Sequence, residues 1–446
     1  NLPAECIECY LKDIDKDDPK YIFLKKMFGN KFNHRLKEEE LSIPVMEKID
    51  YVQSAAFGIW VRAGAVNENE KNAGVSHFIE HMMFKGTETR NARMIAEDID
   101  RIGGQINAFT GKEATCYYVK TIGSNLQKGA EVILDMLLHS VFDKVEMGKE
   151  RKVICEEIKM IQDQPDDLAH DTVTEMLFKG SPLGKSIIGT PTSLKNISRN
   201  VLVKYKEEQY TRDSIVASVA GNFDEEAFCD FLEDKFSSMA ASKECPEVGP
   251  NEHERSFKVM VKDIQQSHIC IAAKGLPLSD KRIYAFQVLN NIMGGSMSSR
   301  LFQNIREEKG LAYSVYSVSS SFSSDGYYLI YAGVGHDKIR HALAGIEEEL
   351  MILKRDGVTQ DELSMSKEQL KSSFIFGQEN VASRMFANGK NVTLLDRVYT
   401  PEEIISEIDS VSLEDIDEVK MLICDPHRYT GVAVTDKRFD WSRAWK

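Results

Sequence analysis

The hydrophobic and polar positions of this chain follow one series of patterns twice. Continuous apolar runs predict a strand in each half, and each run is followed by two segments with the spacing of amphipathic helices. Pairs of segments rich in aromatic and β-branched residues come next and predict hairpin-like strand pairs. The predicted strands lie at 54–62, 105–109 and 114–122, and again at 266–274, 311–322 and 327–334. The predicted helices lie around 77–81 and at 92–102, and again at 283–293 and 298–308.

This repetition predicts an α+β fold of two homologous domains, each with a mostly antiparallel sheet covered by helices. We expect the first domain at residues 34–239 and the second at 255–446. Residues 240–254 read AASKECPEVGPNEHE, a polar stretch with two prolines and a glycine that is typical of an exposed linker. Residues 1–33 form an N-terminal extension to which no domain is assigned. A chain of 446 residues with 42% hydrophobic content can build two cores.

Charge and hydropathy restrict the partners of the chain. The net charge of −14 argues against binding to nucleic acid or anionic membranes and favours basic peptides as substrates. No apolar run has the length of a membrane span. The first residues include acidic side chains, unlike a signal or transit peptide, so we expect a cytoplasmic protein. Of the eight cysteines, Cys6 and Cys9 have CxxC spacing without a second pair nearby, so we expect reduced thiols and an incidental pair.

The strongest chemical signal is the pentad His-Phe-Ile-Glu-His at residues 77–81. His77 and His81 are one helical turn apart and share one helix face, and Glu80 projects from that face as well. The spacing suits two metal ligands and a general base. An apolar helix that carries these polar groups must satisfy them, and a metal ion does so.

A third ligand is predicted on the amphipathic segment 145–162. Glu156 lies on a face with lysines and is expected in solvent. Glu157 lies with Val153, Met160 and Glu150 on a more apolar side, where a carboxylate needs a strong partner, so Glu157 is the predicted ligand. Glu150 lies two turns earlier, where it would hydrogen-bond a ligand histidine and fix its ring, with an ordinary salt bridge as the alternative.

Four segments resemble the pitrilysin-type, or inverzincin, metallopeptidases, a family that includes the mitochondrial processing peptidase beta subunit and short bacterial homologues. They read HFIEHMMFKGT at 77–87, GGQINAFTGKEATCYY at 103–118, ERKVICEEI at 150–158 and REEKGLAYSVYS at 306–317. The resemblance implies one zinc ion per chain, held by His77, His81 and Glu157. It also implies that Arg306 and Tyr313 contact the substrate and stabilise the developing oxyanion.

The segment 103–118 also predicts how a peptide binds. Gly103 and Gly104 end a helix, and the strand that follows lies near the pentad helix. An extended peptide would add to its edge through main-chain groups of residues such as Asn107 and Ala108. Phe84 and Phe109 are candidates for a side-chain pocket, with a place in the core as the equal alternative. The predicted substrate-binding residues are Phe84, Gly104, Asn107, Ala108 and Phe109.

Together these features predict a zinc-dependent endopeptidase in which Glu80 takes the proton from a zinc-activated water. Family members of this length are half of a clamshell, which implies a homodimer whose closed chamber admits unfolded peptides. Each active site would combine the zinc ligands of one subunit with Arg306 and Tyr313 of the other. The alternatives are a beta-type processing subunit that needs a separate partner chain and a non-catalytic structural homologue.

Overall fold

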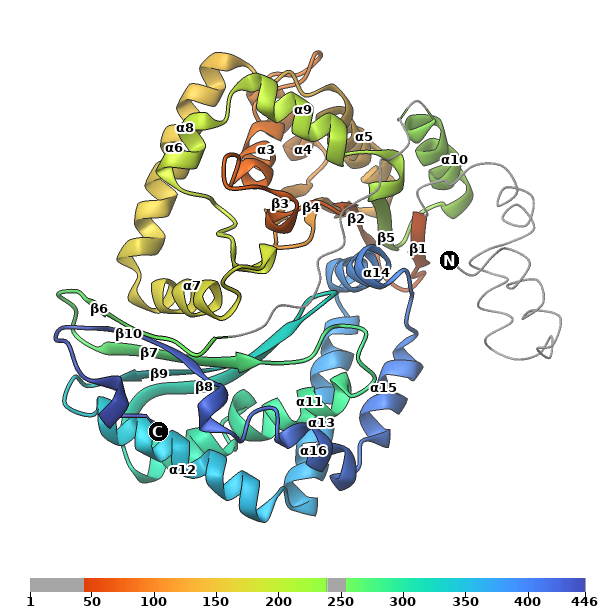
Figure 1. Cartoon of the computed structure of the whole chain (residues 1–446). Coiled ribbons are helices and arrows are strands. Elements are labelled where there is room, and N and C mark those ends of the chain that lie inside the picture. The colour runs from red at the N-terminus through yellow and green to blue at the C-terminus, as the bar shows by residue number, and fades with distance from the viewer. Residues whose placement is uncertain (1–43, 238, 240–253, 446) are drawn as a thin grey trace.

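The computed structural model describes residues 44–237, 239 and 254–445. They form two α+β halves, each built on a five-stranded sheet (Figure 1). The predicted extension at 1–33, the Cys6 and Cys9 pair, and all of the predicted linker except residue 254 lie outside the described residues. No helix within the described ranges is long and apolar enough to span a membrane.

The sheet of the first half has the strand order β1-β5-β2-β4-β3. Its strands are β1 (Pro44–Lys48), β2 (Ser54–Val61), β3 (Gln105–Thr110), β4 (Thr115–Ile122) and β5 (Ile215–Gly221). Strand β1 pairs with β5 in parallel, and the other neighbours are antiparallel. Strand β3 therefore ends the sheet, with one backbone edge unpaired by any other strand of the sheet.

The sheet of the second half repeats this arrangement with the order β6-β10-β7-β9-β8. Its strands are β6 (Phe257–Val261), β7 (Ser267–Lys274), β8 (Ala312–Ser321), β9 (Gly326–Val334) and β10 (Thr430–Thr435). Here too the first strand pairs in parallel, β6 with β10, and the remaining pairs are antiparallel. The prediction of a duplicated α+β fold with mostly antiparallel sheets is confirmed.

Helices cover each sheet on the face that holds the main core. In the first half these are α3 (Val75–Met83), α4 (Ala92–Arg101), α5 (Leu126–His139), α6 (Lys144–Asp163), α8 (Pro191–Asn196), α9 (Arg199–Gln209) and α10 (Glu225–Phe236). In the second half they are α11 (Ile283–Asn290), α12 (Ile339–Asp356), α13 (Gln360–Gln378), α15 (Pro401–Ser410) and α16 (Leu413–Lys420). The segment predicted as a regular helix at 298–308 forms wider π-helical turns at Phe302–Glu308, and a similar stretch at Asn291–Gly295 follows α11.

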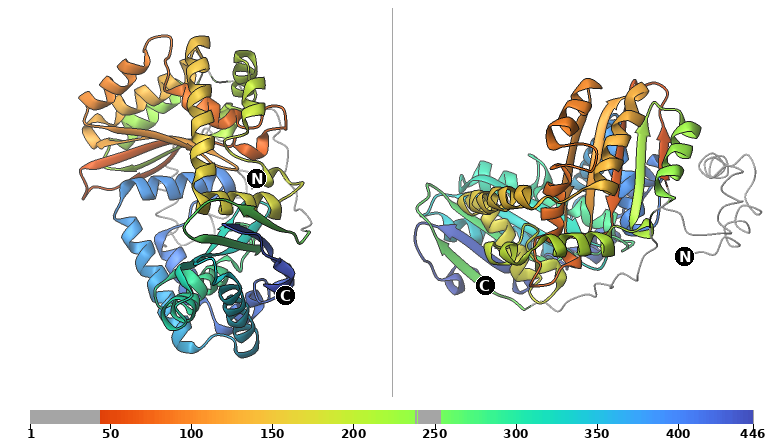
Figure 2. Two further views of the ribbon diagram at one scale, coloured as in Figure 1. Left: turned by 90° about the vertical axis from the view of Figure 1, so that its left-hand side faces the viewer. Right: turned by 90° about the horizontal axis from the view of Figure 1, so that it is seen from above.

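The opposite face of each sheet is covered by a helix from the other half. Helix α14 (Val381–Leu395) lies on the first sheet, and α7 (Pro165–Leu177) lies on the second (Figures 1 and 2). Gly389 allows the close approach of α14, because a Cβ atom there would lie 2.1 Å from Trp60 Nε1. Ser218 Oγ in the first sheet also donates a hydrogen bond to the Met385 carbonyl at 2.8 Å. The exchanged helices join the halves, which lie one above the other in a form consistent with half of a clamshell.

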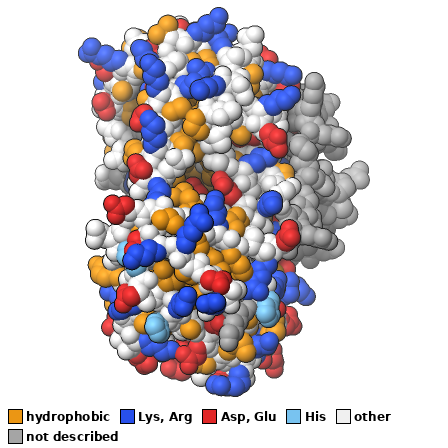
Figure 3. All heavy atoms as spheres, turned by 60° about the vertical axis from the view of Figure 1, so that its left-hand side comes forward, with side chains coloured by type: hydrophobic (Ala, Val, Ile, Leu, Met, Phe, Trp, Pro, Cys, Tyr) orange, Lys and Arg blue, Asp and Glu red, His pale blue; other side chains and the backbone are white. Residues whose placement is uncertain are grey.

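One face of the molecule mixes charged and hydrophobic side chains (Figure 3). On the face in Figure 3, Lys and Arg side chains are interspersed with Asp and Glu, and hydrophobic side chains gather across the middle and lower part. Both signs of charge are therefore mixed on this face.

Candidate active site

Helix α3 carries the pentad and is fixed at its N-terminus. It follows Gly74, whose φ of 89° is left-handed and whose Cβ position would lie 2.7 Å from the Ile188 carbonyl oxygen. The buried Glu68 carboxylate accepts hydrogen bonds from the backbone N–H groups of Gly74 at 2.6 Å and Ser76 at 2.9 Å. A negative charge is favourable at this end of a helix. The core side of α3 buries Val75, Phe78, Ile79, Met82 and Met83.

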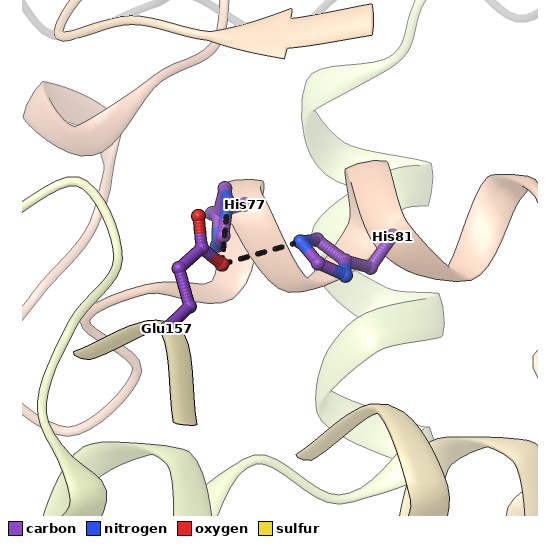
Figure 4. Close-up of side chains that lie close together, drawn as sticks. All are labelled: His77, His81 and Glu157. Atoms are coloured by element: carbon purple, nitrogen blue, oxygen red, sulfur yellow. Dashed lines mark ion pairs between the residues drawn. The ribbon is translucent and has the colours of Figure 1, made fainter. Parts of the chain in front are cut away.

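Helices α3 and α6 bring His77, His81 and Glu157 together (Figure 4). Glu157 Oε2 lies 3.7 Å from His77 Nε2 and 3.6 Å from His81 Nε2. The two imidazole rings have centroids 4.6 Å apart. One ligand atom from each residue lies within 4.8 Å of the others. These are the three residues predicted as metal ligands from the sequence.

The donor set fits a zinc ion. Bonds of about 2.0–2.1 Å in a tetrahedral arrangement separate neighbouring ligand atoms by about 3.4 Å, close to both measured distances. Glu157 Oε2 is buried and has no hydrogen-bond partner among the described residues. Leaving a buried anionic oxygen unpaired is costly, and a cation would satisfy it. Two imidazoles and one carboxylate also leave a fourth position for a water molecule or substrate.

Glu150 orients one of the ligand histidines. Its Oε2 lies 3.1 Å from His81 Nδ1, and its Oε1 lies 2.8 Å from Lys85 Nζ. When His81 is neutral, a proton on Nδ1 is donated to Glu150, which leaves the lone pair on Nε2 to face Glu157. Glu150 is 6% exposed, so solvent competes little with this contact.

Two of the three candidate ligands, His77 and Glu157, already have the protonation state that metal binding requires. Burial and the neighbouring His81 lower the pKa of His77 to about 4. Interaction with His81 lowers the pKa of Glu157. Burial disfavours the charged form of His81, but Glu157 and Glu150 outweigh it and raise the pKa of His81. At neutral pH His77 is neutral and Glu157 is ionised, as in metal binding, while a metal ion would compete with the proton on His81.

Glu80 lies between the two histidines in sequence and contacts the end of β3. Its Oε2 accepts a hydrogen bond from the Thr110 hydroxyl. Burial raises the pKa of Glu80, although the Thr110 bond opposes that shift. A carboxylate whose pKa is raised toward neutrality is better suited to exchange protons with a substrate.

Four of the five predicted peptide-binding residues lie on or just before the edge strand β3, whereas Phe84 directly follows helix α3. Asn107 and Ala108 pair with β4 on one side, and the other side of β3 faces no strand of the sheet. Gly104 immediately precedes this strand. Helix α3 packs on β3, so the free edge lies beside the pentad helix.

Phe84 and Phe109 lie on opposite faces of this sheet. Phe84 packs against the main core with Ala108. Phe109 points the other way, where its ring lies 5.5 Å from Trp60 and 5.8 Å from Phe386 of the exchanged helix α14. The structure therefore does not bring Phe84 and Phe109 together into one pocket.

Arg306 and Tyr313 lie together in the second half. The Arg306 guanidinium lies 5.7 Å from the centroid of the Tyr313 ring. Strand β8 has a bulge between Ala312 and Ser314, and Tyr313 is 74% exposed there. A bulge re-aims the side chain that it carries. Among the described residues, neither side chain forms a hydrogen bond or ion pair with the three candidate metal ligands.

Three features of the site differ from the sequence reasoning or were not predicted by it. The expectation that Val153 and Met160 mark an inward side of α6 is wrong, since they are 48% and 60% exposed. The contact of Thr110 with Glu80 and the cap formed by Glu68 were not predicted. Thr110 stands in the quoted segment 103–118 at an alternating position of a strand, which was the available signal for it.

Comparisons with known proteins agree with this geometry. The profile described as insulinase (peptidase family M16) matches residues 45–191, and that of the peptidase M16 inactive domain matches 196–370. The chain is 44% identical to the "uncharacterized zinc protease YmxG" of Bacillus subtilis (strain 168), over 83% of this chain and 91% of that protein. It is 36% identical to an "uncharacterized zinc protease" of Rickettsia felis, over 82% of this chain and 89% of that protein.

A solved protease from Helicobacter pylori has the same fold, with a TM-score of 0.83 and 20% identity over 89% of this chain and 98% of that chain. At that identity the likeness concerns the fold alone. The profile matches, however, cover both halves of the duplicated fold, and the curated relatives align over most of their length. The chain belongs to the insulinase family, peptidase family M16.

Proposed function

We propose that this protein is a zinc-dependent endopeptidase that hydrolyses unfolded peptides. The observation that carries the proposal is the convergence of His77, His81 and Glu157 around one point, with the Glu80 carboxylate on the same helix. The names of the curated relatives, which are zinc proteases, support the same reaction class.

The chemistry follows from the roles of these side chains. A zinc ion bound by the three ligands would act as a Lewis acid toward a water molecule and the scissile carbonyl. Glu80 accepts the proton of the attacking water and then delivers it to the leaving amine. Glu150 keeps the His81 proton on Nδ1, so that Nε2 stays available as a ligand.

Substrate binding is assigned to the free edge of β3. A peptide that pairs with this edge is held through its main chain, so it must be extended and unfolded, and its sequence matters little. Asn107, Ala108 and Gly104 would meet the peptide backbone, with Phe84 and Phe109 contacting side chains on either face of the strand. The net charge of −14 favours basic peptides.

Arg306 and Tyr313 are assigned to the oxyanion, and we place them in the active site of a second copy of the chain. Tyr313 is exposed, Arg306 is half-buried beside it, and among the described residues neither is bonded to the candidate ligands of its own chain. A guanidinium and a phenol aimed at the carbonyl oxygen would stabilise the charge that develops there. The proposal therefore includes a homodimer with two composite sites.

The test is cleavage of a quenched, basic, unstructured peptide by the purified chain without any partner, with zinc supplied. The wild-type chain is expected to cleave, and Glu80→Gln is expected to lose nearly all activity while it still binds one zinc ion per chain. Glu70→Gln, an exposed position ten residues earlier, is the matched control and should keep full activity. Lack of cleavage by the wild-type chain would favour a partner-dependent subunit or a non-catalytic homologue.

A further inference from the structure

We propose that Thr110 is a positioning residue for Glu80, and that its hydroxyl sets the direction in which the catalytic carboxylate points. The inference rests on the proposed peptidase function. The Thr110 Oγ1 donates a hydrogen bond to Glu80 Oε2. Within the part of the chain that the structure describes, Glu80 accepts a side-chain hydrogen bond from no other residue. This single contact therefore selects one carboxylate oxygen and leaves Oε1 for the proton of the water.

Glu80 needs such a guide because its side chain has three rotatable bonds. A carboxylate that can rotate freely spends much of its time away from the proton that it must take, and orientation accounts for a large part of general base catalysis. Two phenols lie near Glu80, but they pair with each other. Tyr117 Oη and Tyr210 Oη are buried and 2.9 Å apart, and among the described residues neither phenol forms a hydrogen bond with Glu80, whereas the Thr110 hydroxyl does.

The backbone around Thr110 is held by hydrogen bonds, and this fixes the position of the Thr110 hydroxyl. Thr110 is the last residue of β3 and pairs with Thr115 of β4. The turn that follows is closed by a hydrogen bond of 2.8 Å from Gly111 N–H to the Ala114 carbonyl. Its outer side is held by Val66 N–H, which donates to the Lys112 carbonyl at 2.9 Å.

The turn after β3 is also held in place by the backbone at Gly64, which packs closely against it. A Cβ atom at Gly64 would lie 2.5 Å from the Lys112 carbonyl oxygen, so only glycine fits there. The β-branched Thr110 side chain also has few χ1 rotamers. The Thr110 hydroxyl therefore has a more fixed position than a hydroxyl on an unconstrained loop would have, and it can orient the Glu80 carboxylate accordingly.

The position of Thr110 also links substrate binding to the base. The same short strand carries Asn107 and Ala108 at the proposed peptide-binding edge and Thr110 at the catalytic carboxylate. The strand alternates, so Ala108 and Thr110 point to the α3 side together. Strand β3 therefore determines both the register in which the peptide pairs and the direction in which the Glu80 carboxylate points.

Three variants at this position separate positioning from a general structural role. Thr110→Val keeps the shape and branching but removes the hydroxyl, Thr110→Ser keeps the hydroxyl, and Thr110→Ala is a second variant without it. We expect kcat to fall about tenfold or more in Thr110→Val and Thr110→Ala, with KM changed less than about twofold. Thr110→Ser should stay within about threefold of the wild-type kcat. Zinc affinity, measured by competition with a chromophoric chelator, should be unchanged in all three.

A double variant completes the test. If Thr110 acts through Glu80, adding Thr110→Val to Glu80→Gln should cause little further loss of activity, because residues that act as a unit are not additive. Three outcomes would overturn the positioning role and leave the peptidase function in place. The first is that the losses of activity in the double variant multiply, and the second is that Thr110→Ser loses as much kcat as Thr110→Val. The third is that Thr110→Val keeps a normal kcat while Glu80→Gln is inactive. A wild-type chain with no zinc-dependent hydrolysis would overturn both.

Discussion

His81 Nδ1 lies 3.1 Å from the Oε2 of Glu150, on the side of the ring away from Glu157. The contact determines which nitrogen of His81 carries the proton. It also ties together α3 and α6, the two helices that supply the candidate ligands. Lys85 pairs with the other oxygen of the same carboxylate, so Glu150 is held from both sides.

Replacing Glu150 is therefore expected to weaken zinc binding without removing a ligand. Glu150→Ala should lower zinc affinity by about tenfold to a hundredfold, the usual effect of losing a carboxylate that orients a ligand histidine. Competition with a chelator of known affinity measures this directly. Glu146→Ala, on the same helix and at a carboxylate that pairs with Lys149, is the control and should bind zinc normally. Equal affinities for Glu150→Ala and Glu146→Ala would contradict the role.

The role of Glu157 as the third metal ligand can be tested by comparing variants at Glu157 and at the adjacent Glu156. Glu157→Ala should abolish stoichiometric zinc binding, because two imidazoles alone form an incomplete site. Glu156 is adjacent in sequence, but its side chain is 68% exposed and pairs with Lys159, so Glu156→Ala should retain one zinc ion per chain. Elemental analysis after gel filtration distinguishes the two results. Full zinc content in Glu157→Ala would remove Glu157 from the ligand set.

Glu68 gives a prediction about pH. Burial raises the pKa of Glu68 from 4.5 to about 7, so the folded state holds this proton more tightly than the unfolded chain. The stability that the protonated group contributes is complete below pH 4.5 and is lost as the pH rises through about 7. The unfolding free energy of the wild-type chain should therefore fall by a few kcal/mol relative to that of Glu68→Gln between about pH 5 and pH 8.

Urea unfolding of both proteins across this pH range makes the measurement. Glu70→Gln, at an exposed position in the same loop, should run parallel to the wild-type chain. If the difference between wild type and Glu68→Gln stays constant with pH, the helix N–H groups stabilise the Glu68 carboxylate enough to cancel its burial.

The sequence predicted the features of this site that are local and missed those that depend on packing. His77, Glu80 and His81 lie within one helical turn and a little more, so their shared face follows from helix geometry alone. Glu157 was predicted as a metal ligand from helical periodicity together with the family resemblance. The same periodicity failed for Val153 and Met160, which are exposed, because an apolar residue on a surface helix need not face a core.

The contact between Thr110 and Glu80 required knowledge of how β3 lies across α3, which no local pattern contains. The exchange of α7 and α14 was missed for a related reason. A hydrophobic helix face indicates that the helix is covered, but not which of two similar sheets covers it. The duplication itself was visible because each half repeats one order of elements.

The exchanged helix α14 predicts a contrast between two glycines. A methyl group at Gly389 would lie 2.1 Å from Trp60 Nε1, so Gly389→Ala must push α14 away from the first sheet. Overpacking of this kind costs about 1–3 kcal/mol. Gly377 is also helical but has no atom within 4 Å of its Cβ position, so Gly377→Ala should be neutral or stabilising by up to about 1 kcal/mol. Thermal unfolding compares the two, and an unchanged Tm in Gly389→Ala would mean that the contact is looser than described.

The composite active site predicts complementation between two inactive chains. His81→Ala lacks a zinc ligand but keeps Arg306 and Tyr313, whereas Arg306→Ala keeps the zinc ligands. If each site takes its zinc from one subunit and its arginine from the other, a heterodimer of the two variants contains one site with every group intact. After subunit exchange, a mixture at equal concentrations should recover up to about a quarter of wild-type activity, since half of the dimers are mixed and each has one complete site. Tagged chains prove that exchange has occurred. Proven heterodimers without recovered activity would show that Arg306 serves the zinc site of its own chain or none.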